Sequence, residues 1–475
     1  MSVDRLSGFD ATFLYAESPA APFEIASCVV VDAEAGRERY SFDRVRELVA
    51  GRLHLAPRLR QRLVHVPFEL DRPVWVDDAD FDIDAHVFRS ALPAPGGRRE
   101  LQAMLGELLS RPLDRDRPLW ELHVIEGLED RRIAGFVKTH HAMVDGVAGF
   151  ELLTTFLDDA PDAVPPAPDG AWLPGRTPGP AELAVRAIPT LVRQPWRTTR
   201  TFADLALGRF RSVGGAIAGP TDRKQRVGGG KRVSYGDAPP TPFNAAVQAH
   251  RRAALVDMAF ADARRVADGA GVTINDVIVA AVGGAARRYL LRHDALPEES
   301  LVAFVPVSTR GDGNGNGDGS NSTSLMYASM GTDVDDARDR LTAVAATTRR
   351  GKSEHKKHGA GMPTDLTAVA GAAGAAVVGR VLAESGLARR LRLGGNVVVS
   401  NIPGPDRRLW FAGAPVERLY PFGPLVDGNA LNVTVLSYRR ERLSFGLVGD
   451  REAMDDLEAF GDDLRASVDE LAGAY

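Results

Sequence analysis

Two adjacent histidines, His140 and His141, are followed closely by Asp145 and Gly146. A free imidazole has a pKa of about 6.5, so near neutral pH it can accept a proton from an attacking hydroxyl group. Successive side chains of an extended chain point to opposite sides, so the two rings cannot do the same work. We expect one ring to be a candidate base and the other to pack inward or to be held by the turn.

The residues around this pair indicate where it lies in the fold. The apolar run 133–137 is typical of a buried strand, and apolar residues recur at helical spacing from Val147 to Phe156. The histidines therefore stand where a strand passes into a helix. Backbone N–H groups at such a place are unpaired and favour developing negative charge, and Gly146 would permit a close backbone approach at the turn.

The spacing His140-His141-x-x-x-Asp145-Gly146 resembles the HHxxxDG signature of the CoA-dependent acyltransferase superfamily. Within it, the chain resembles the bacterial wax ester synthase/diacylglycerol acyltransferase family. The matching blocks are Leu6-Ser7-Gly8-Phe9-Asp10-Ala11-Thr12-Phe13-Leu14-Tyr15, Pro118-Leu119-Trp120-Glu121, Asn275-Asp276-Val277, Pro306-Val307-Ser308-x-Arg310 and Ser400-Asn401-Ile402-Pro403-Gly404-Pro405.

This resemblance implies a fold and an activity. The fold is α/β, a two-lobed chloramphenicol-acetyltransferase-like fold with mixed β-sheets flanked by helices and an inter-lobe tunnel. The activity is acyl-CoA-dependent O-acyl transfer in a ternary complex, with His141 as general base and Asp145 holding the loop. The acceptor is diacylglycerol first and a long-chain fatty alcohol second. Long-chain acyl-CoA is a co-substrate, and neither a further cofactor nor a metal is expected.

The other blocks carry candidate substrate-binding and supporting residues. Asn275 and Asp276 open a predicted helix after Thr273, so they either cap that helix or shape the substrate channel. Ser400 and Asn401 end a predicted strand; they are either part of a turn or face His141 and donate to the thioester oxygen. The family pattern also includes Arg310 as a substrate-binding candidate. Trp120 and Pro118 are expected to pack below the site.

Three other interpretations compete with direct transfer. A covalent acyl-enzyme would need an activated Ser or Cys, but the chain has no G-x-S-x-G pentapeptide and its single cysteine, Cys28, lies in an apolar run. The HxxxxD pattern of glycerol-phosphate acyltransferases fits His140 and Asp145 but leaves His141 and Gly146 unexplained. A non-catalytic lipid-binding or droplet-coating protein could use the same scaffold.

The stretch 312–323 imitates a calcium-binding loop but lacks the closing Glu, so a loop without bound calcium is expected.

Composition limits the remaining possibilities. The chain has 475 residues, 44% hydrophobic and 25% charged, with a net charge of −5. This is typical of a globular protein of two or three domains, and the absence of a long basic block argues against nucleic acid as a partner. We predict an N-terminal lobe at 1–160, a Pro/Gly-rich connector with a helix at 161–240 and a C-terminal lobe at 241–475.

The N-terminus lacks a secretory signal pattern, and no run reaches the ~18 apolar residues of a spanning helix. We therefore expect a cytoplasmic protein that meets a membrane or lipid-droplet surface peripherally. The Ala/Gly-rich stretch 366–379 is either an ordinary packed helix or, with Arg389, Arg390 and Arg392 after it, a membrane contact.

Hydrophobic periodicity and capping residues predict the elements. Ser41 is the expected N-cap of one helix. The expected strands are 23–32, 62–66, 73–76, 123–125, 133–139, 301–307, 324–330, 396–400, 431–438 and 443–448, and the expected helices are 41–49, 99–113, 258–268, 274–292, 335–350 and 454–471.

Overall fold

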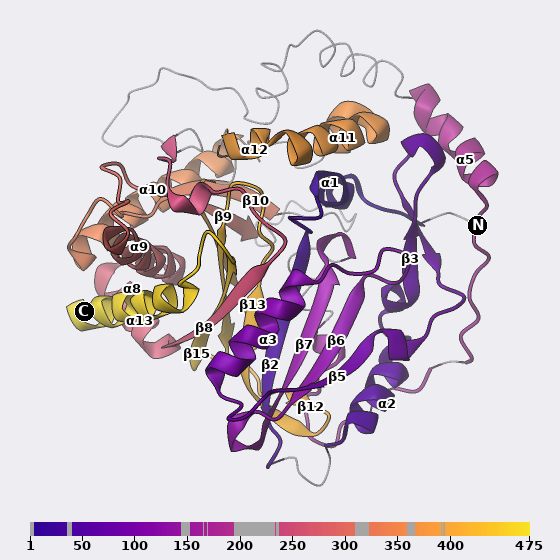
Figure 1. Ribbon diagram of the computed structural model, residues 1–475, viewed down its shortest axis with the longest axis horizontal. Helices are drawn as coiled ribbons and strands as arrows, with labels where there is room; N and C mark the ends of the chain where they lie inside the picture. The colour runs from indigo at the N-terminus through magenta and orange to yellow at the C-terminus, as the bar shows by residue number, and fades with distance from the viewer. Residues whose placement is uncertain are drawn as a thin grey trace.

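The computed structural model describes residues 4–35, 40–143, 153–164, 166–168, 170–193, 233, 237–308, 323–358, 366–390, 392 and 395–475. Two six-stranded sheets lie side by side, each with helices against it, and a small three-stranded sheet lies beside the first (Figure 1). The predicted α/β class and two-lobed architecture are confirmed.

The N-terminal sheet holds the histidine strand near its centre. Its order is β12-β13-β2-β7-β6-β5, and only β5 and β6 are parallel among its pairs. The small sheet has the order β1-β4-β3. The strands are β12 (Trp410–Phe411), β13 (Ala414–Phe422), β2 (Glu24–Asp32), β7 (Arg132–His140), β6 (Trp120–Glu126), β5 (Val87–Ala91), β1 (Asp4–Arg5), β4 (Val74–Asp77) and β3 (Gln61–Val64).

The C-terminal sheet has the order β10-β9-β11-β14-β15-β8, with β11 parallel to both of its neighbours. Its helices bury one face of the sheet in a large apolar cluster that includes Val277, Phe445 and Phe460. The strands are β10 (Thr323–Ser329), β9 (Val302–Ser308), β11 (Val397–Ile402), β14 (Leu431–Tyr438), β15 (Arg442–Asp450) and β8 (Arg251–Ala259); the helices are α8 (Phe260–Ala270), α9 (Ile274–Arg292), α10 (Ala337–His358) and α13 (Leu457–Ala474).

Among the described residues, four helices belong to the N-terminal side and two lie above the lobes in Figure 1. They are α1 (Gly8–Ala16), α2 (Phe42–Arg52), α3 (Arg98–Ser110), α5 (Pro180–Arg193), α11 (Leu366–Ser385) and α12 (Leu387–Arg390). The predicted N-cap of α2 is confirmed, because the Ser41 side chain accepts a hydrogen bond from the backbone N–H of Arg44 at 3.1 Å. In the predicted connector, α5 packs Leu183 and Ala187 against Val66, Val74 and Val76.

The two lobes exchange chain segments. Strand β13 comes from the C-terminal part of the chain but pairs with β2, so it completes the N-terminal sheet. Helix α3 lies between the sheets: the side chain of Gln102 accepts from Leu255 N–H of β8 at 2.9 Å, and that of Ser110 accepts from Arg251 N–H at 2.8 Å. The predicted boundary at 241 does not anticipate this exchange.

Most predicted elements are present, and the omissions have a common cause. The predicted helix 258–268 is partly wrong, because Met258 and Ala259 end strand β8 and the helix begins at Phe260. Strand β13 was not predicted, since it contains Pro415 and Pro421 and a charged pair, which are unfavourable for a strand in isolation. Both strands are stabilised by partners far away in sequence.

Helix α11 occupies the stretch for which packing and membrane contact were both considered. It packs on α1, and a Cβ atom added at Gly379 would lie 2.6 Å from the carbonyl oxygen of Tyr15. Ala375 and Ala376 are buried. Arg389 of α12 lies 3.8 Å from Asp427. The small residues of α11 therefore serve close helix packing.

Within the described residues, no single helix is long and apolar enough to span a membrane; the pair α8 and α9, bent by 104°, meets that test jointly.

Gly379 and Gly51 provide a matched pair of substitutions in helices. Gly379→Ala should lower the free energy of unfolding by about 1–3 kcal/mol, because α11 must move away from the Tyr15 backbone. Gly51→Ala should raise it by about 0.5–1 kcal/mol, because nothing lies within 4 Å of the added Cβ and Ala favours a helix. Urea unfolding of both variants measures the difference. Equal stabilities would contradict the close approach of α11 to α1.

Candidate active site

Strand β7 delivers the two histidines to the end of the N-terminal sheet. The strand lies between β2 and β6 and is buried along nearly its whole length. It ends at His140, whose N–H donates to the carbonyl of Leu119 at 3.0 Å. His141 begins a short 3₁₀ turn, His141–Met143, and its N–H donates to the carbonyl of Phe23 at 2.8 Å. Backbone hydrogen bonds on both sides thus hold the pair in place.

His140 is the inward-facing histidine. It is 1% exposed, its Nδ1 accepts from the N–H of Ala142 at 3.0 Å, and its Nε2 lies 2.8 Å from Oε2 of Glu17. Since Nδ1 accepts, Nε2 carries the proton and donates to Glu17. Burial, together with the positive charge of Arg115, lowers the pKa of His140 to about 3. A histidine with this pKa is too weak a base to serve near neutral pH.

His141 is the partly exposed histidine. Its ring stacks on Phe13 of α1, with centroids 4.0 Å apart and planes at 28°. The Nδ1 atom is buried, whereas the residue as a whole is partly exposed. Phe13 and the backbone bond to Phe23 together fix the direction of the ring. The structure therefore separates the two histidines into one buried support and one partly exposed ring, as the alternation along the strand predicts.

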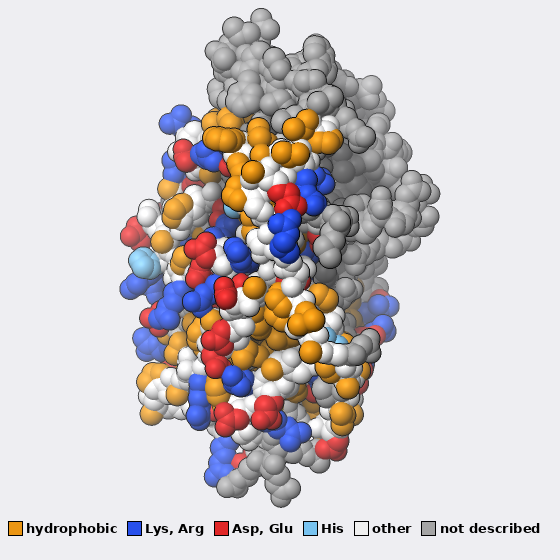
Figure 2. Space-filling model, turned by 90° about the vertical axis from the view of Figure 1, so that its right-hand side faces the viewer, with side chains coloured by type: hydrophobic (Ala, Val, Ile, Leu, Met, Phe, Trp, Pro, Cys, Tyr) orange, Lys and Arg blue, Asp and Glu red, His pale blue; other side chains and the backbone are white. Residues whose placement is uncertain are grey.

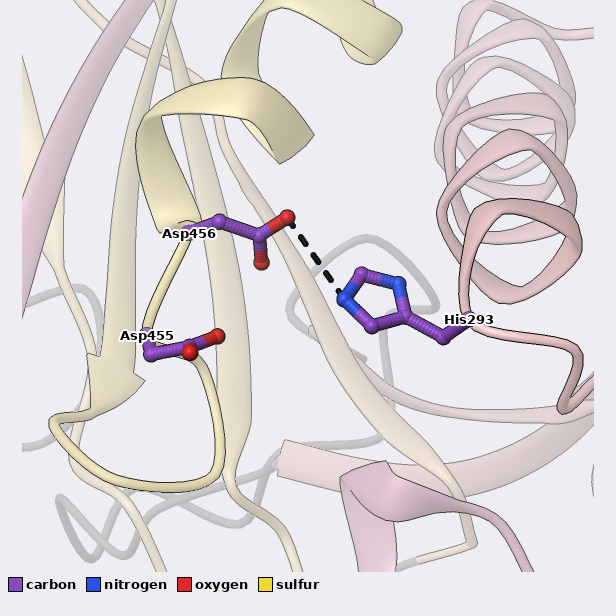
Figure 3. A group of neighbouring side chains, drawn as sticks. All are labelled: His293, Asp455 and Asp456. Carbon is purple, nitrogen blue, oxygen red and sulfur yellow. Dashed lines mark ion pairs between the residues drawn. The ribbon is translucent and has the colours of Figure 1, made fainter.

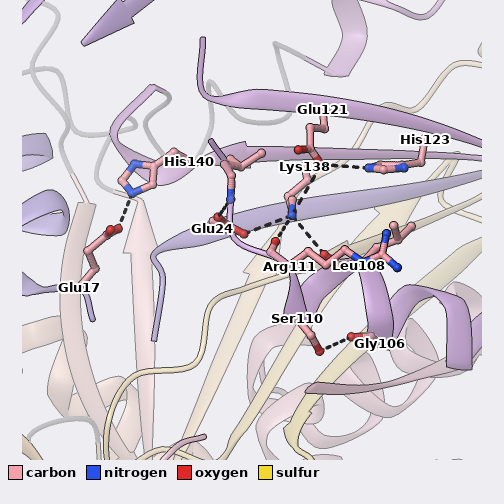
Figure 4. Close-up of polar contacts among 11 residues, drawn as sticks. Glu17, Glu24, Gly106, Leu108, Ser110, Arg111, Glu121, His123, Lys138 and His140 are labelled. Carbon is pink, nitrogen blue, oxygen red and sulfur yellow. Dashed lines mark hydrogen bonds and ion pairs between the residues drawn. The ribbon is translucent and has the colours of Figure 1, made fainter. Parts of the chain in front are cut away.

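A buried cation lies on the same strand. Lys138 is 1% exposed, and its Nζ donates to the carbonyls of Leu108, at 3.1 Å, and Arg111 at the end of α3 (Figure 4). Carboxylate oxygens of Glu24 and Glu121 lie 3.6 and 3.8 Å away. Because a positive charge satisfies the last carbonyls of a helix and favours its dipole, Lys138 joins α3 to β7.

The pKa values of the two carboxylates near Lys138 are shifted in opposite directions. Burial raises the pKa of Glu24, although Lys138 and the N–H of Leu113 oppose it. Burial would also raise the pKa of Glu121, but the hydrogen bond with His123 at 3.0 Å and the charge of Lys138 outweigh it and hold that pKa below its usual range. The negative charges of the two carboxylates and the positive charge of Lys138 thus offset one another beside the histidines.

The Pro-Leu-Trp block forms a support under β7. Trp120 is fully buried, pairs with Thr139 of β7 and donates its indole N–H to the carbonyl of Leu59 at 2.8 Å. His86 stacks on it with centroids 4.7 Å apart. Pro118 is also buried. These contacts agree with packing roles for Trp120 and Pro118.

Asp276 has a structural position at the start of α9. It is 1% exposed; Oδ2 accepts from the N–H and the hydroxyl of Thr273, both at 2.8 Å, and Oδ1 accepts from the hydroxyl of Thr348 at 2.5 Å. Both carboxylate oxygens are therefore used within a capping box and a tie to α10. This favours the capping interpretation over a place in the substrate channel. Asn275, its neighbour, is partly exposed.

Ser400 and Asn401 lie near the end of β11, and both are partly exposed. The next residue, Ile402, packs against the apolar cluster that contains Ala142 and Met143 of the histidine turn. The end of β11 thus reaches the same core as the end of β7. Three predicted site residues, Asp145, Gly146 and Arg310, lie outside the described part of the chain.

Glu17 and Arg115 are two supporting residues that the sequence did not reveal. Glu17 follows α1, contacts His140 and forms an ion pair with Arg115. Its distance from His140 along the chain is 123 residues, so no local pattern could connect them. Phe13 lies in a recognised block, yet its stacking on His141 depends on how α1 folds over the end of β7.

One group among the described residues could offer three metal-ligand atoms: His293, Asp455 and Asp456, with these atoms within 4.8 Å of one another (Figure 3). It lies on the C-terminal lobe. Asp456 is 3.6 Å from His293 and 3.8 Å from Arg292, and Nδ1 of His293 contacts the carbonyl of Tyr289 at 2.8 Å. Ion pairs and a backbone contact within the protein thus account for the positions of His293 and Asp456.

Comparison with solved structures defines the class of fold. The first condensation domain of the calcium-dependent antibiotic synthetase matches with a TM-score of 0.53 and 17% identity, covering 99% of this chain and 96% of that domain. Such low identity shows the fold alone. The wax ester synthase/diacylglycerol acyltransferase from Marinobacter aquaeolei VT8 matches with a TM-score of 0.70 and 30% identity, covering 99% of this chain and 100% of that one.

Comparison of sequences defines the family. Residues 6–278 match the wax ester synthase/diacylglycerol acyltransferase catalytic domain, and residues 319–472 match the C-terminal domain of the same family. Two Mycobacterium tuberculosis proteins provisionally named diacylglycerol O-acyltransferases are 35% and 34% identical, each over 99% of this chain and over 90% and 99% of their own lengths. The chain belongs to this family, and the predicted class, an O-acyltransferase, is confirmed.

The pKa of His140 predicts how stability depends on pH. The folded protein holds this pKa at about 3, whereas the unfolded chain has about 6.5. Below pH 6.5 His140 therefore binds a proton in the unfolded state but stays unprotonated in the folded state. The free energy of unfolding consequently falls as the pH falls. Between pH 7 and pH 5 this one residue should remove about 2 kcal/mol.

A His140→Gln variant retains hydrogen-bonding atoms but does not titrate. Urea unfolding at pH 7 and pH 5 should show that the wild-type protein loses about 2 kcal/mol more than this variant over that interval. Parallel losses in the two proteins would show that His140 is protonated when folded.

Proposed function

We propose that this protein transfers the acyl group of long-chain acyl-CoA to the free hydroxyl of diacylglycerol, which yields triacylglycerol and CoA. The observation that carries the proposal is the different placement of the two histidines, one buried and neutral, the other stacked on Phe13 and partly exposed. The names of the relatives support diacylglycerol as acceptor. A long-chain fatty alcohol is the second candidate, because the Marinobacter relative is named as a wax ester synthase as well.

In the proposed reaction His141 is the general base. Since its Nδ1 is buried, Nε2 is the nitrogen that can meet a substrate hydroxyl. It removes the proton as the alcohol oxygen attacks the thioester carbon, the C–S bond breaks, and the CoA thiolate leaves and takes up the proton. Asp145 and Gly146 would hold the loop after His141. Ser400 or Asn401, near the end of β11, would donate to the oxygen that develops negative charge.

Direct transfer in a ternary complex is supported by the setting of the single cysteine. Cys28 is fully buried on β2, and burial raises the pKa of its thiol to about 12. A nucleophilic cysteine requires an accessible thiolate. Cys28 offers neither access nor charge, so an acyl-cysteine does not fit this site.

Mass spectrometry of the intact protein tests the absence of an acyl-enzyme. After incubation with acyl-CoA alone, the protein should keep its unmodified mass, and a Cys28→Ala variant should transfer acyl groups at a rate close to the wild-type rate. An adduct of acyl mass that disappears when alcohol is added would replace direct transfer with a two-step mechanism.

Separation of neutral lipids tests the reaction itself. Purified protein supplied with radiolabelled palmitoyl-CoA should form labelled triacylglycerol with diacylglycerol, and a smaller amount of labelled wax ester with hexadecanol. The His141→Ala variant should lose about 10²- to 10⁴-fold in kcat, because removal of a general base has that effect. The matched control is His65→Ala, which removes an exposed histidine of the same lobe and should leave turnover unchanged.

The outcomes distinguish the candidates. Faster formation of wax ester would make a fatty alcohol the acceptor. Binding of acyl-CoA without product from either acceptor would favour the non-catalytic lipid-binding protein. If His141→Ala kept more than half of the wild-type turnover, another group would have to be the base.

We further propose that the protein works at the surface of a membrane or lipid droplet. Diacylglycerol, fatty alcohols and the expected products are insoluble in water, so a peripheral contact would bring the enzyme to them. The sequence pointed to 366–393 as the contact region. The packing of α11 on α1 and the pairing of Arg389 with Asp427 weaken that choice.

A further inference from the structure

Three exposed apolar side chains lie on two neighbouring elements of the N-terminal side of the molecule. Phe68, Val185 and Ile188 are 91%, 64% and 52% exposed, which is unusual for large apolar residues. Phe68 lies on the short turn η2 (Pro67–Glu69), between β3 and β4, and this turn contacts α5, which carries the other two. We call these three residues the apolar tip.

The backbone of the turn holds Phe68 outward. Phe68 and Glu69 have φ angles of 56° and 53°, the left-handed region that bulky side chains avoid. A glycine or asparagine would suit this conformation better. A phenylalanine that is both strained and almost fully exposed does not contribute to the core, which indicates that it has a partner outside the chain.

Helix α5 is apolar on two sides. Leu183 and Ala187 pack against the small sheet, whereas Val185 and Ile188 face away from it. Figure 2 shows the side of the molecule that lies on the right in Figure 1. Hydrophobic side chains gather in its upper part, at the height that α5 occupies in Figure 1. The inward side attaches the helix to the small sheet. The outward side is therefore available to a second apolar environment.

The charges around the apolar tip suit an anionic surface. The charged residues of 67–72 and 180–188 and their ion-pair partners comprise five arginines and three carboxylates, a surplus of two positive charges in a chain of net charge −5. Every one of the three carboxylates is in an ion pair. The group consists of Arg5, Arg72, Arg176, Arg186, Arg380, Glu69, Asp71 and Glu182.

The apolar tip is connected to the candidate active site. The turn η2 contacts α11 as well as α5, and Arg380 of α11 reaches Glu69 at 3.2 Å. Helix α11 packs on α1 through Gly379 and Tyr15. Phe13 of α1 stacks on His141. The tip is thus linked through α11 and α1 to the histidine proposed as the base.

We propose that the apolar tip inserts into an anionic phospholipid surface and that the surrounding arginines bind its headgroups. This surface differs from the stretch 366–393 indicated by the sequence. The inference rests on the proposed function, since a lipid surface is where diacylglycerol would be found. Binding combines buried apolar area with electrostatic attraction, so it should be reversible and sensitive to salt.

Vesicle flotation tests the proposal with the full chain. The vesicles contain phosphatidylcholine with one part in three of phosphatidylserine, or phosphatidylcholine alone. The triple variant Phe68→Ser, Val185→Ser, Ile188→Ser should bind the anionic vesicles at least about tenfold more weakly than wild type, because each side chain loses its apolar transfer energy. The control Val164→Ser, Leu291→Ser removes apolar side chains that are 88% and 50% exposed elsewhere and should bind normally.

Charge is tested separately. Arg72→Gln with Arg186→Gln should weaken binding to the anionic vesicles and reduce its dependence on salt, with little effect on phosphatidylcholine alone. Circular dichroism should show unchanged folding in each variant. Flotation equal to wild type in the triple variant would overturn the proposal, and a change in oligomeric state in that variant would mean that a second copy of the chain covers the tip.

An activity assay separates this proposal from the proposed function. With a short, water-soluble alcohol and acyl-CoA, the triple variant should turn over at the wild-type rate, whereas with diacylglycerol in anionic vesicles its rate should fall with its binding. If wild type lacks activity with every acceptor but still floats through the tip, the proposed function fails and the docking surface stands.

Discussion

The pairing of β2 with its two neighbours is the constraint on which the rest of the structure depends. On one side β2 pairs with β7 in a register that places Glu24 opposite His140. On the other side it pairs with β13, which arrives from the far end of the chain. One strand therefore positions the histidines and joins the two lobes. The apolar contacts among β2, α3 and β8 bury the junction, with Cys28, Leu105 and Leu255 among its members.

Different degrees of burial give the two histidines different properties. His140 is enclosed with Glu17 and the N–H of Ala142, and that enclosure makes it neutral and rigid. Its lone pair on Nδ1 accepts from Ala142 in the turn that begins at His141, and its proton on Nε2 goes to Glu17 after α1. Two identical side chains thus differ in their chemistry because the strand turns one inward and leaves the other partly exposed. Lys138 adds a buried charge on the same strand, and it is tolerated because carbonyls and carboxylates surround it.

Contacts among α1, α11 and the turn η2 connect the histidine turn with the exposed apolar residues of the N-terminal side. Helix α11, which is apolar in sequence, uses its glycine and alanines to approach α1 closely. The exposed apolar residues of the N-terminal side lie instead on η2 and α5. An apolar helix and an exposed apolar surface are therefore different properties here, because the first depends on total composition and the second on which side chains remain uncovered.

Local patterns in the sequence were sufficient for many elements. Helix α9 and strand β14 have the predicted bounds, and Ser41 caps α2, because periodicity and capping act over a few residues. Several of the elements missed, among them β5, β8 and β13, are strands whose stability comes from partners elsewhere in the chain. The position of Asp276 in a capping box was one of two open interpretations, and only the contacts to Thr273 and Thr348 decided between them.

The sequence by itself determined the family, the strand that carries the histidines and the types of side chain available for acid–base chemistry, since these depend on residue identity and short spacing. Only the tertiary structure decided that His140 is the buried support, that Glu17 and Arg115 stand behind it and that Phe13 orients His141. It also decided which apolar residues remain on the surface. The physical reason is the same in each case: burial and side-chain contacts are set by segments far apart along the chain, and no local pattern contains them.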